Sequence, residues 1–312
     1  MDIDKAEFKP TSTIQNCLNC QDTNITFFSR FIHHGIELNY CICKHCGLIF
    51  QNPTFTKSQW ESFYKFAYRK IYSDSINPTD KIRIEHKKRA EYQTDIISHH
   101  IKSVRSHLDI GCAAGELLIC IKKRYLPEYQ CGIEPGDGYR RSCEENGFEV
   151  YSSLEALQSA RQDKFELITM SHVIEHIPNP VEYLKFVVEF LLSKDGYLVA
   201  EVPNIRGGKS FEIAHPICFS KKTLSDSLRL AGLDIAYSHL HGKPKSKIRG
   251  HIYYLAISRR KNSGPKDDKP RRISWWYLIT SKMMMLRGIN DNWFSFLLKL
   301  PYRCAKYGFT AR

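Results

Sequence analysis

Two short segments carry small and acidic residues in a spacing that suits a nucleotide-type ligand. Residues 107–115 read His-Leu-Asp-Ile-Gly-Cys-Ala-Ala-Gly, an apolar strand that runs into a turn of small residues. Residues 131–135 read Cys-Gly-Ile-Glu-Pro, a second apolar strand that ends on the carboxylate of Glu134. Small residues let the backbone approach a ligand, and a carboxylate at the next strand end can bind ribose hydroxyls. The segments therefore predict a nucleotide-type cofactor site on a doubly wound sheet.

Two pairs of cysteines near the amino end have the spacing of a structural metal site. The pairs are Cys17 with Cys20 and, after 22 intervening residues, Cys43 with Cys46. Two thiolates from each tight turn would complete a closed tetrahedral zinc site, which stabilises a small ribbon with little core of its own. Cys41 could compete as a ligand, and His45 is a weaker competitor. A catalytic zinc would need an open position and an acid or base, which nothing here indicates.

A third polar group follows the strand expected at 165–170. His172, Glu175 and His176 have the i, i+3, i+4 spacing that shares one face of a helix. His172 is the first candidate for a general base, followed by His176 and His215, because imidazole exchanges protons near neutral pH. These four residues could also hold a divalent metal ion. Alternatively, Glu175 caps or braces the loop, and the histidines are hydrogen-bonded structural residues.

The elements that must position these residues alternate between strand and helix. Strands are expected at 105–110, 129–134, 147–151, 165–170 and 197–202, and helices at 115–124, 138–146, 153–160 and 180–192. This alternation predicts an α/β fold, a Rossmann-like seven-stranded sheet flanked by helices and mostly parallel. After a helix near 220–231, the runs 232–240 and 250–258 are expected to form an antiparallel hairpin that closes the sheet edge.

The domain organisation follows from these elements. We expect a zinc ribbon at 1–56, a helical linker and cofactor lid at 57–104, a cofactor-binding domain at 105–260, and a basic, aromatic-rich tail at 261–312. The linker includes a long helix from about 81 to 104. Its Tyr64 and Tyr68 could close over the cofactor or could serve only for packing.

The formal charge of +13 is concentrated in the tail. From Arg259 to Arg312 there are 13 Lys or Arg and 3 Asp, a net charge of +10. The body is therefore nearly neutral, which weakens any argument from charge to nucleic acid. The amino end lacks the basic and then apolar order of a secretory signal, and no run of about 18 apolar residues exists. With eleven cysteines, this favours a reducing, cytoplasmic location and metal binding over disulfides.

The tail mixes aromatic and aliphatic residues with Lys and Arg over 273–300. Such a mixture suits an interfacial helix on an anionic bilayer, which would place the protein at the inner face of the membrane and near a lipid-linked saccharide. The alternative is a helical subdomain that packs on the sheet or on a partner protomer.

From about residue 85 to 260 the chain resembles the class I S-adenosylmethionine-dependent methyltransferases. The resemblance rests on the ordered segments 108–115, 132–135, 165–177, 196–199 and 202–204, and on His215-Pro216-x-x-Phe219-Ser220. The whole chain resembles the subgroup in which a zinc ribbon precedes this domain and runs into a stretch like Cys46–Pro53. Members of that subgroup often act in sugar, surface-polysaccharide or secondary-metabolite pathways.

The resemblance implies S-adenosylmethionine as cofactor. Asp109 would orient the turn or contact the amino group of the methionine part, and Glu134 would accept from both ribose hydroxyls. Ser153 and Leu154 would lie near the adenine. Met170 would reach the cofactor or pack in the core. The full cofactor set is Asp109, Gly111, Cys112, Ala113, Gly115, Glu134, Ser153, Leu154, Met170 and Ser171. The family usually has glycine where this chain has Ala113.

The expected function is methyl transfer to a hydroxylated small molecule, foremost a sugar or secondary-metabolite intermediate. A sulfonium methyl is already activated, so the protein mainly aligns acceptor, methyl and sulfur. One alternative is an RNA 2′-O-methyltransferase, because the histidine and glutamate set resembles the magnesium site of such enzymes for small RNA. Nucleic acid is the less favoured partner, since the ribbon lacks interleaved basic and aromatic residues. The other alternative is a cofactor-binding scaffold without catalysis.

Overall fold

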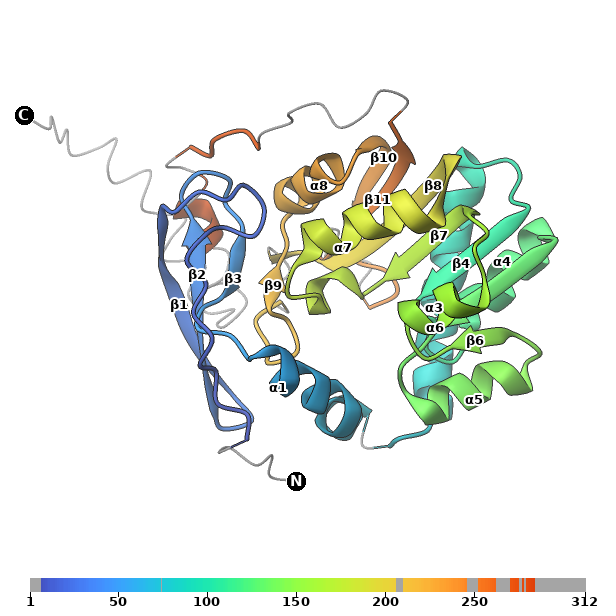
Figure 1. The fold of residues 1–312 in the computed structure, drawn as a ribbon, viewed down its shortest axis with the longest axis horizontal. Helices are drawn as coiled ribbons and strands as arrows, with labels where there is room; N and C mark the ends of the chain where they lie inside the picture. Colours follow the sequence, from blue (N-terminus) through green and yellow to red (C-terminus); the bar gives the residue numbers. More distant parts are fainter. Residues whose placement is uncertain are drawn as a thin grey trace, which may run out of the picture.

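The computed structural model describes residues 7–73, 75–205, 210–245, 252–261, 270–274, 277 and 279–283. Figure 1 shows two β-sheets joined by a helical segment, with the amino-terminal sheet in blue standing beside a larger sheet that carries helices on its faces. We call residues 7–56 the N-terminal ribbon. Among the described helices, none is long and apolar enough to cross a membrane.

The sheet of the N-terminal ribbon is antiparallel and has the order β1-β2-β3-β9. Its first three strands are β1 (Ile25–His33), β2 (Ile36–Cys43) and β3 (Ile49–Gln51). The fourth, β9 (Ile217–Cys218), comes from the far end of the chain and pairs with β3. The expected ribbon at 1–56 therefore lacks one strand of its own sheet, which the sequence analysis did not anticipate.

The linker consists of α1 (Lys57–Ser62), the π-helical turn η1 (Phe63–Ala67), α2 (Tyr68–Ser73) and α3 (Asp80–His100). Thr56 starts α1 in a capping box with Gln59, and Thr79 caps α3. Ile101 has extended backbone, so α3 ends at His100 and the helix expected to reach 104 is too long. Helical residues in this segment are 57–73 and 80–100.

The larger sheet has seven strands in the order β10-β11-β8-β7-β4-β5-β6. Its strands are β4 (Ser106–Ile110), β5 (Tyr129–Ile133), β6 (Glu149–Tyr151), β7 (Phe165–Ser171), β8 (Leu192–Pro203), β10 (Leu233–His241) and β11 (Tyr253–Arg260). Five neighbouring strands, β6, β5, β4, β7 and β8, run parallel to one another. Strand β11 pairs antiparallel with both β8 and β10. The Rossmann-like sheet with its closing hairpin is confirmed.

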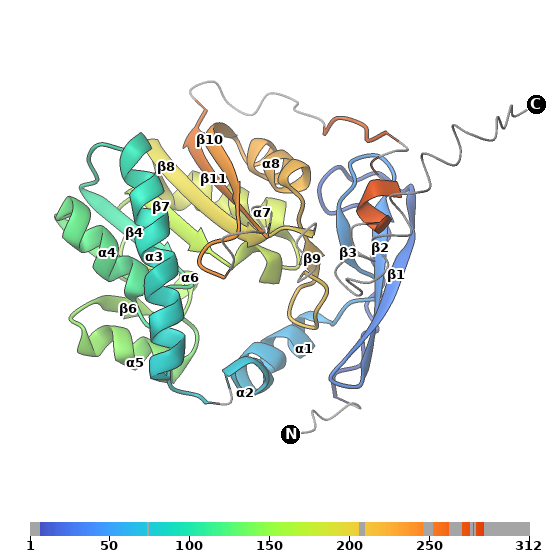
Figure 2. The same cartoon turned by 180° about the vertical axis from the view of Figure 1, so that it is seen from behind.

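Helices cover both faces of this sheet (Figure 2). Besides α3, they are α4 (Glu116–Tyr125), α5 (Asp137–Glu145), α6 (Leu154–Ala160), η2 (Ile174–His176), α7 (Pro180–Phe186), η3 (Val187–Leu191) and α8 (Lys221–Leu230). On one face, α3 and α4 pack through Ile97 and Leu117. On the other, α6, α7 and α8 share a core with the strands and with cysteines of the ribbon. Strand β8 starts at Leu192, five residues before the predicted strand.

Candidate functional site

The predicted cofactor residues lie where the strand order of the sheet reverses. The chain leaves β4 toward β5 and β6 on one side, and then returns to β7 on the other side of β4. In open α/β sheets such a switch point leaves a crevice beyond the carboxyl ends of the strands. The turn 111–115 follows β4 there, and Ser171 and His172 stand at the end of β7. The sheet thus brings together residues separated by some sixty positions in the chain.

The turn after β4 has three residues with positive φ: Gly111 at +74°, Ala113 at +49° and Gly115 at +90°. A Cβ atom on Gly111 would lie 2.4 Å from Val173 Cγ2, so glycine lets this turn pack on the loop after β7. The Glu134 side chain, only 4% exposed, accepts hydrogen bonds from the backbone amides of Ala113 (3.1 Å) and Gly136 (2.9 Å). The carboxylate is therefore fixed against the turn.

Asp109 lies below this turn, buried at the end of β4. Its Oδ1 accepts a hydrogen bond of 2.6 Å from the Thr169 hydroxyl on β7. Burial raises the pKa of Asp109 to about 7, and the nearby Glu134 carboxylate adds to the rise, although the Thr169 hydrogen bond opposes it. A carboxyl group with this pKa is sensitive to a cation that arrives in the crevice.

The other predicted cofactor residues have varied surroundings. Cys112 is buried in the turn, and its Sγ lies 3.8 Å from that of Cys143. Ser153 caps α6 by accepting from the Ala156 amide, and Leu154 is the first residue of that helix. Met170 is fully buried in the core, whereas Ser171 accepts a hydrogen bond from Gln93 of α3.

Segments of the linker lie against the same end of the sheet. A Cβ atom on Gly138, at the start of α5, would come within 2.4 Å of atoms of Ile76 and Asn77. Arg83 of α3 contacts Glu116 at 3.6 Å and donates a hydrogen bond to Ser142 of α5. The linker therefore packs against α4 and α5, and its role as a cofactor lid stays a prediction.

His172 is held between two carboxylates. Its Nδ1 lies 3.3 Å from Glu175 Oε1, and its Nε2 lies 3.2 Å from Glu201 Oε1. The backbone of His172 has a φ of +56°, an uncommon conformation outside glycine. Glu201, which also contacts His241 Nε2 at 3.0 Å, is a site residue that the sequence analysis missed. Its one signal was an acidic residue within the apolar strand 197–202.

His176 has a different environment. Its Nδ1 lies 2.8 Å from the carbonyl oxygen of Ala214, which can only accept, so Nδ1 carries the proton. Burial lowers the pKa of His176 to about 4, with a further contribution from His215. The ring is therefore neutral near pH 7, and its Nε2 has no hydrogen-bond partner among the described residues. The rings of Tyr64 and Tyr68, from η1 and α2, pack against it at 5.9 and 5.6 Å.

His215 stands beside His176, with the ring centroids 4.9 Å apart, and both of its nitrogens are engaged. Nδ1 donates to the Ser210 carbonyl at 3.1 Å, and Nε2 lies 2.9 Å from Glu212 Oε1. Burial lowers the pKa of His215, but Glu212 outweighs this, so the pKa lies above its ordinary value. Glu212 is a second residue that the sequence analysis missed, because its role arises only when the loop folds back.

The expected four-residue metal set is brought together only in part. Ligand atoms of Glu175, His176 and His215 lie within 4.8 Å of one another, and neither oxygen of Glu175 has a hydrogen bond in the described part of the chain. His172 is directed to Glu201 as well as to Glu175. A metal ion at this position would have to displace Glu212 or Ser210 from His215.

The four expected zinc ligands form one cluster in the ribbon. Their sulfur atoms all lie within 4.8 Å of one another, with Cys17 to Cys46 at 3.4 Å and Cys20 to Cys43 at 3.5 Å. A tetrahedral ion with Zn–S bonds of about 2.3 Å sets its sulfurs about 3.8 Å apart, so the donor set fits zinc. The two competitors lie apart from this cluster: Cys41 Sγ is 4.0 Å from the Asn52 carbonyl, and His45 Nε2 is 3.0 Å from that of Pro270.

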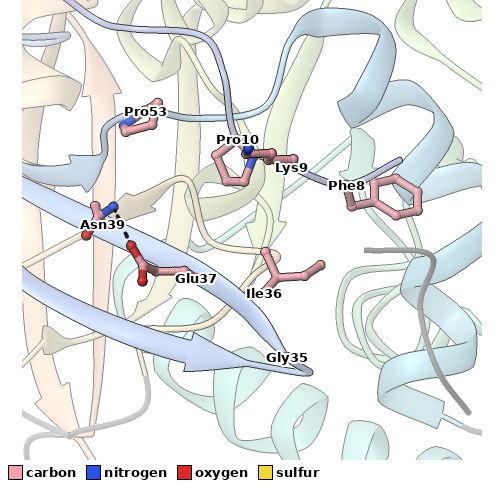
Figure 3. Close-up of a pocket in the computed structure, with 8 residues that line it drawn as sticks. All are labelled: Phe8, Lys9, Pro10, Gly35, Ile36, Glu37, Asn39 and Pro53. Atoms are coloured by element: carbon pink, nitrogen blue, oxygen red, sulfur yellow. Dashed lines mark hydrogen bonds between the residues drawn. The ribbon is translucent and has the colours of Figure 1, made fainter. Parts of the chain in front are cut away.

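A cavity of about 390 Å³ lies elsewhere, on the N-terminal ribbon (Figure 3). Two of its polar side chains, Glu37 and Asn39, are hydrogen-bonded to each other at 3.3 Å. None of the predicted site residues contributes to it. Its lining is Phe8, Lys9, Pro10, Gly35, Ile36, Glu37, Asn39 and Pro53.

Residues 84–254, more than half of the chain, match the family model described as a methyltransferase domain. No curated protein matches the chain. A solved S-adenosylmethionine-dependent methyltransferase from Archaeoglobus fulgidus has 20% identity and a TM-score of 0.45, covering 58% of this chain and 100% of its own. A possible histamine N-methyltransferase from Thermotoga maritima has 16% identity and a TM-score of 0.46, covering 65% and 99%. The plantazolicin methyltransferase BpumL, solved with S-adenosylhomocysteine, has 13% identity and a TM-score of 0.49, covering 65% and 93%.

Proposed function

The chain belongs to the methyltransferase-domain family, and on this premise we propose that it methylates a hydroxyl group of a small molecule with His176 as the general base. It is a class I S-adenosylmethionine-dependent methyltransferase. The state of His176 carries the proposal, because the neutral ring keeps a nitrogen lone pair on Nε2. Both nitrogens of the other two candidates, His172 and His215, already contact polar partners.

The residues at the strand ends suit S-adenosylmethionine. This cofactor would supply an activated methyl group on a sulfonium centre. The turn 111–115 with Cys112 would lie against its methionine part, where Asp109 can attract the amino group. Glu134 would bind the ribose, and Ser153 and Leu154 would contact the adenine. The buried Met170 and the half-buried Ser171, at the end of β7, would support the floor of the crevice.

The acceptor side combines aromatic rings with groups that bind hydroxyls. Tyr64 and Tyr68 present ring faces and edges around His176, and Glu212 and His215 form an ion pair beside it. Aromatic faces together with ionised hydrogen-bonding groups suit a polyhydroxylated ring such as a sugar. His172, between two carboxylates, would hold the loop after β7 in position or contact the acceptor.

The test is a methyl-transfer screen with isotopically methyl-labelled S-adenosylmethionine. The acceptors are a panel of nucleotide sugars and, in a separate arm, short single-stranded RNA with a free 2′-hydroxyl end. We expect label on a sugar hydroxyl and a loss of at least about 100-fold in kcat for His176→Asn, the size typical of a lost general base. Cofactor binding by calorimetry should be unchanged in this variant. Label on RNA alone, or cofactor binding without transfer to any acceptor, would reject the proposal.

A divalent metal at Glu175, His176 and His215 would predict dependence on added metal ions. Turnover should instead persist after treatment with a chelator, provided that zinc in the ribbon is monitored separately. Magnesium-dependent transfer to RNA would favour the alternative function as an RNA 2′-O-methyltransferase.

For the N-terminal ribbon we propose one structural zinc ion held by Cys17, Cys20, Cys43 and Cys46. The sulfur distances and the closed, four-thiolate donor set support this assignment. Elemental analysis of the purified protein should give one zinc per chain, and Cys17→Ser should abolish it. A protein that folds and retains its thermal stability without metal would contradict the assignment.

A further inference from the structure

The N-terminal ribbon shares its sheet with the loop that carries the acceptor-side residues. Strand β9 begins two residues after His215 and pairs with β3, with Ile49 opposite Cys218 and Phe50 opposite Ile217. The Gln51 amide continues this ladder by donating to the Pro216 carbonyl at 2.8 Å. The loop 210–216 is thus anchored to the ribbon at its end, and both views show β9 beside β3 (Figures 1 and 2).

The side chain of Gln51 holds the interior of that loop. It is 1% exposed, and its Nε2 lies 3.1–3.2 Å from the carbonyl oxygens of Glu212, Ile213 and His215. The Tyr40 hydroxyl, also buried, donates to the Glu212 carbonyl at 3.0 Å. Carbonyls are acceptors only, which fixes the amide orientation with its nitrogen toward the loop. The opposite atom, Gln51 Oε1, is buried and lacks a hydrogen bond within the described residues.

An unmatched amide oxygen is a cost that a purely apolar side chain would avoid. Gln51 therefore serves the loop as a donor rather than the ribbon as a packing residue. Three carbonyl oxygens of the loop point toward the Gln51 Nε2 atom and share its two hydrogens. These shared hydrogen bonds hold the loop in this conformation.

That conformation determines the state of the proposed base. The Ala214 carbonyl, one residue from two of the carbonyls that Gln51 binds, accepts from both the Tyr64 hydroxyl (2.9 Å) and His176 Nδ1 (2.8 Å). This contact places the proton of His176 on Nδ1 and leaves Nε2 as the basic atom. Glu212, in the same loop, holds His215 beside it.

We propose that Gln51 and Tyr40 are positioning residues through which the N-terminal ribbon sets the tautomer and orientation of His176. The ribbon is then a part of the acceptor site, and it acts through the loop 210–216. This inference rests on the proposed function insofar as His176 is the base, but the positioning itself is a property of the protein without substrate.

The experiment measures that property directly. Nitrogen NMR of histidine-labelled protein distinguishes the Nδ1-protonated from the Nε2-protonated ring, and the His176→Asn variant assigns the resonance. The wild type should show one Nδ1-protonated form of His176 near pH 7. Gln51→Leu, which removes the donors at similar volume, should give a mixture of tautomers. Tyr40→Phe, which keeps the ring and removes one donor, should give a smaller shift in the same direction.

The matched control is Thr54→Val, which removes another buried ribbon hydroxyl that has no hydrogen bond in the described part of the chain. It should leave the His176 signal unchanged. Zinc content and cofactor binding by calorimetry should match the wild type in all three variants. With the nucleotide sugar that gives the highest turnover in the screen, Gln51→Leu should lower kcat at least tenfold and Thr54→Val should not.

The outcomes separate the two claims. An unchanged His176 signal in a folded, zinc-containing Gln51→Leu protein would overturn the positioning role, whatever its turnover. A changed signal together with no methyl transfer by the wild type would overturn the proposed function and leave the positioning role standing. If Gln51→Leu fails to fold, Tyr40→Phe decides by the same signal.

Discussion

At the scale of single residues, Ala113 is the one departure of the cofactor turn from the family pattern, and its φ of +49° puts it in the left-handed region. A side chain there costs about 1–2 kcal/mol, whereas glycine costs about 0.5–1 kcal/mol in unfolded-state entropy. Ala113→Gly should therefore change the free energy of unfolding by about 0–1 kcal/mol in the stabilising direction. Urea denaturation measures this, and calorimetry should show unchanged cofactor affinity.

The matched control is the neighbouring Ala114, which is fully buried and has no positive φ. Ala114→Gly loses a buried methyl group and gains unfolded-state entropy, so it should destabilise the protein by about 1–2 kcal/mol. Equal destabilisation by both substitutions would show that the turn stores no strain at Ala113.

Asp109 predicts a pH dependence of cofactor binding. With a pKa of about 7, its carboxyl group is mostly protonated at pH 6 and mostly ionised at pH 7.5. Only the ionised form attracts the ammonium group of the cofactor, so affinity should fall as the pH drops through 7. Between pH 7.5 and 6 the dissociation constant should rise roughly fivefold, because the ionised fraction of Asp109 falls about eightfold while the cofactor's own amino group, with an ordinary pKa of about 7.7–8.0, becomes slightly more protonated.

Near pH 7, cofactor binding should release a proton from Asp109. Calorimetry in two buffers of different ionisation enthalpy would detect this proton. Asp109→Asn keeps an oxygen that can accept from Thr169 but cannot titrate, so its affinity should be weaker and nearly independent of pH over this range. A wild-type affinity that stays constant from pH 6 to 7.5 would mean that Asp109 does not meet the cofactor's charge.

At the scale of elements, the regular alternation of apolar strands and helices was enough to predict the sheet, because each β–α unit is local in sequence. The turn at 111–115 and Glu134 could be placed for the same reason, since they follow predicted strand ends. Strand β9 could not be predicted, because two residues show no periodicity. Glu201 was missed because its partner His172 is 29 positions away in the chain. Glu212 lies only three residues before His215, but the contact between them arises only when the loop folds back.

The π-helical turn η1 provides a prediction at this scale. The Tyr64 hydroxyl donates to the carbonyls of His176 (3.2 Å) and Ala214 (2.9 Å), which ties the linker to the acceptor side. Tyr64→Phe removes these bonds and should lower the free energy of unfolding by about 1–2 kcal/mol. It should also lower kcat, because the contact that orders the His176 loop is lost.

The control for this prediction is Tyr125→Phe at the end of α4. Its hydroxyl donates to the Ile101 carbonyl at 2.9 Å, away from the strand ends that form the crevice. It should cost a similar free energy of unfolding, about 1 kcal/mol, with unchanged kcat. If Tyr64→Phe and Tyr125→Phe have the same kcat, Tyr64 contributes only to packing and stability.

At the scale of the whole molecule, the start of the tail lies on the ribbon. The Pro270 carbonyl and the Ile273 amide are hydrogen-bonded to His45, between the second pair of cysteines. The Tyr277 hydroxyl is 2.6 Å from Ser220 Oγ, and its ring covers Gly47. The described residues at the start of the tail therefore contact the ribbon and the residue that caps α8. The aromatic and basic residues beyond 283, on which the membrane hypothesis depends, lie outside the described residues.

Two deletions distinguish these roles of the tail. Removing 262–312 uncovers the turn Cys43–Gly47, so zinc should pass to a chromophoric chelator faster than from the full chain, and the melting temperature should fall. Removing only 284–312 keeps the contacts to His45, Gly47 and Ser220 and should leave the rate of zinc release and the melting temperature unchanged.

Cosedimentation with anionic vesicles tests the membrane hypothesis on the same proteins. Residues 284–312 carry five Lys or Arg and one Asp among their aromatic residues. Loss of vesicle binding in the shorter deletion with intact zinc retention would therefore assign lipid contact to that segment. Equal vesicle binding by all three proteins would exclude the tail as the lipid-binding segment, and equal zinc release would show that its packing on the ribbon contributes no protection.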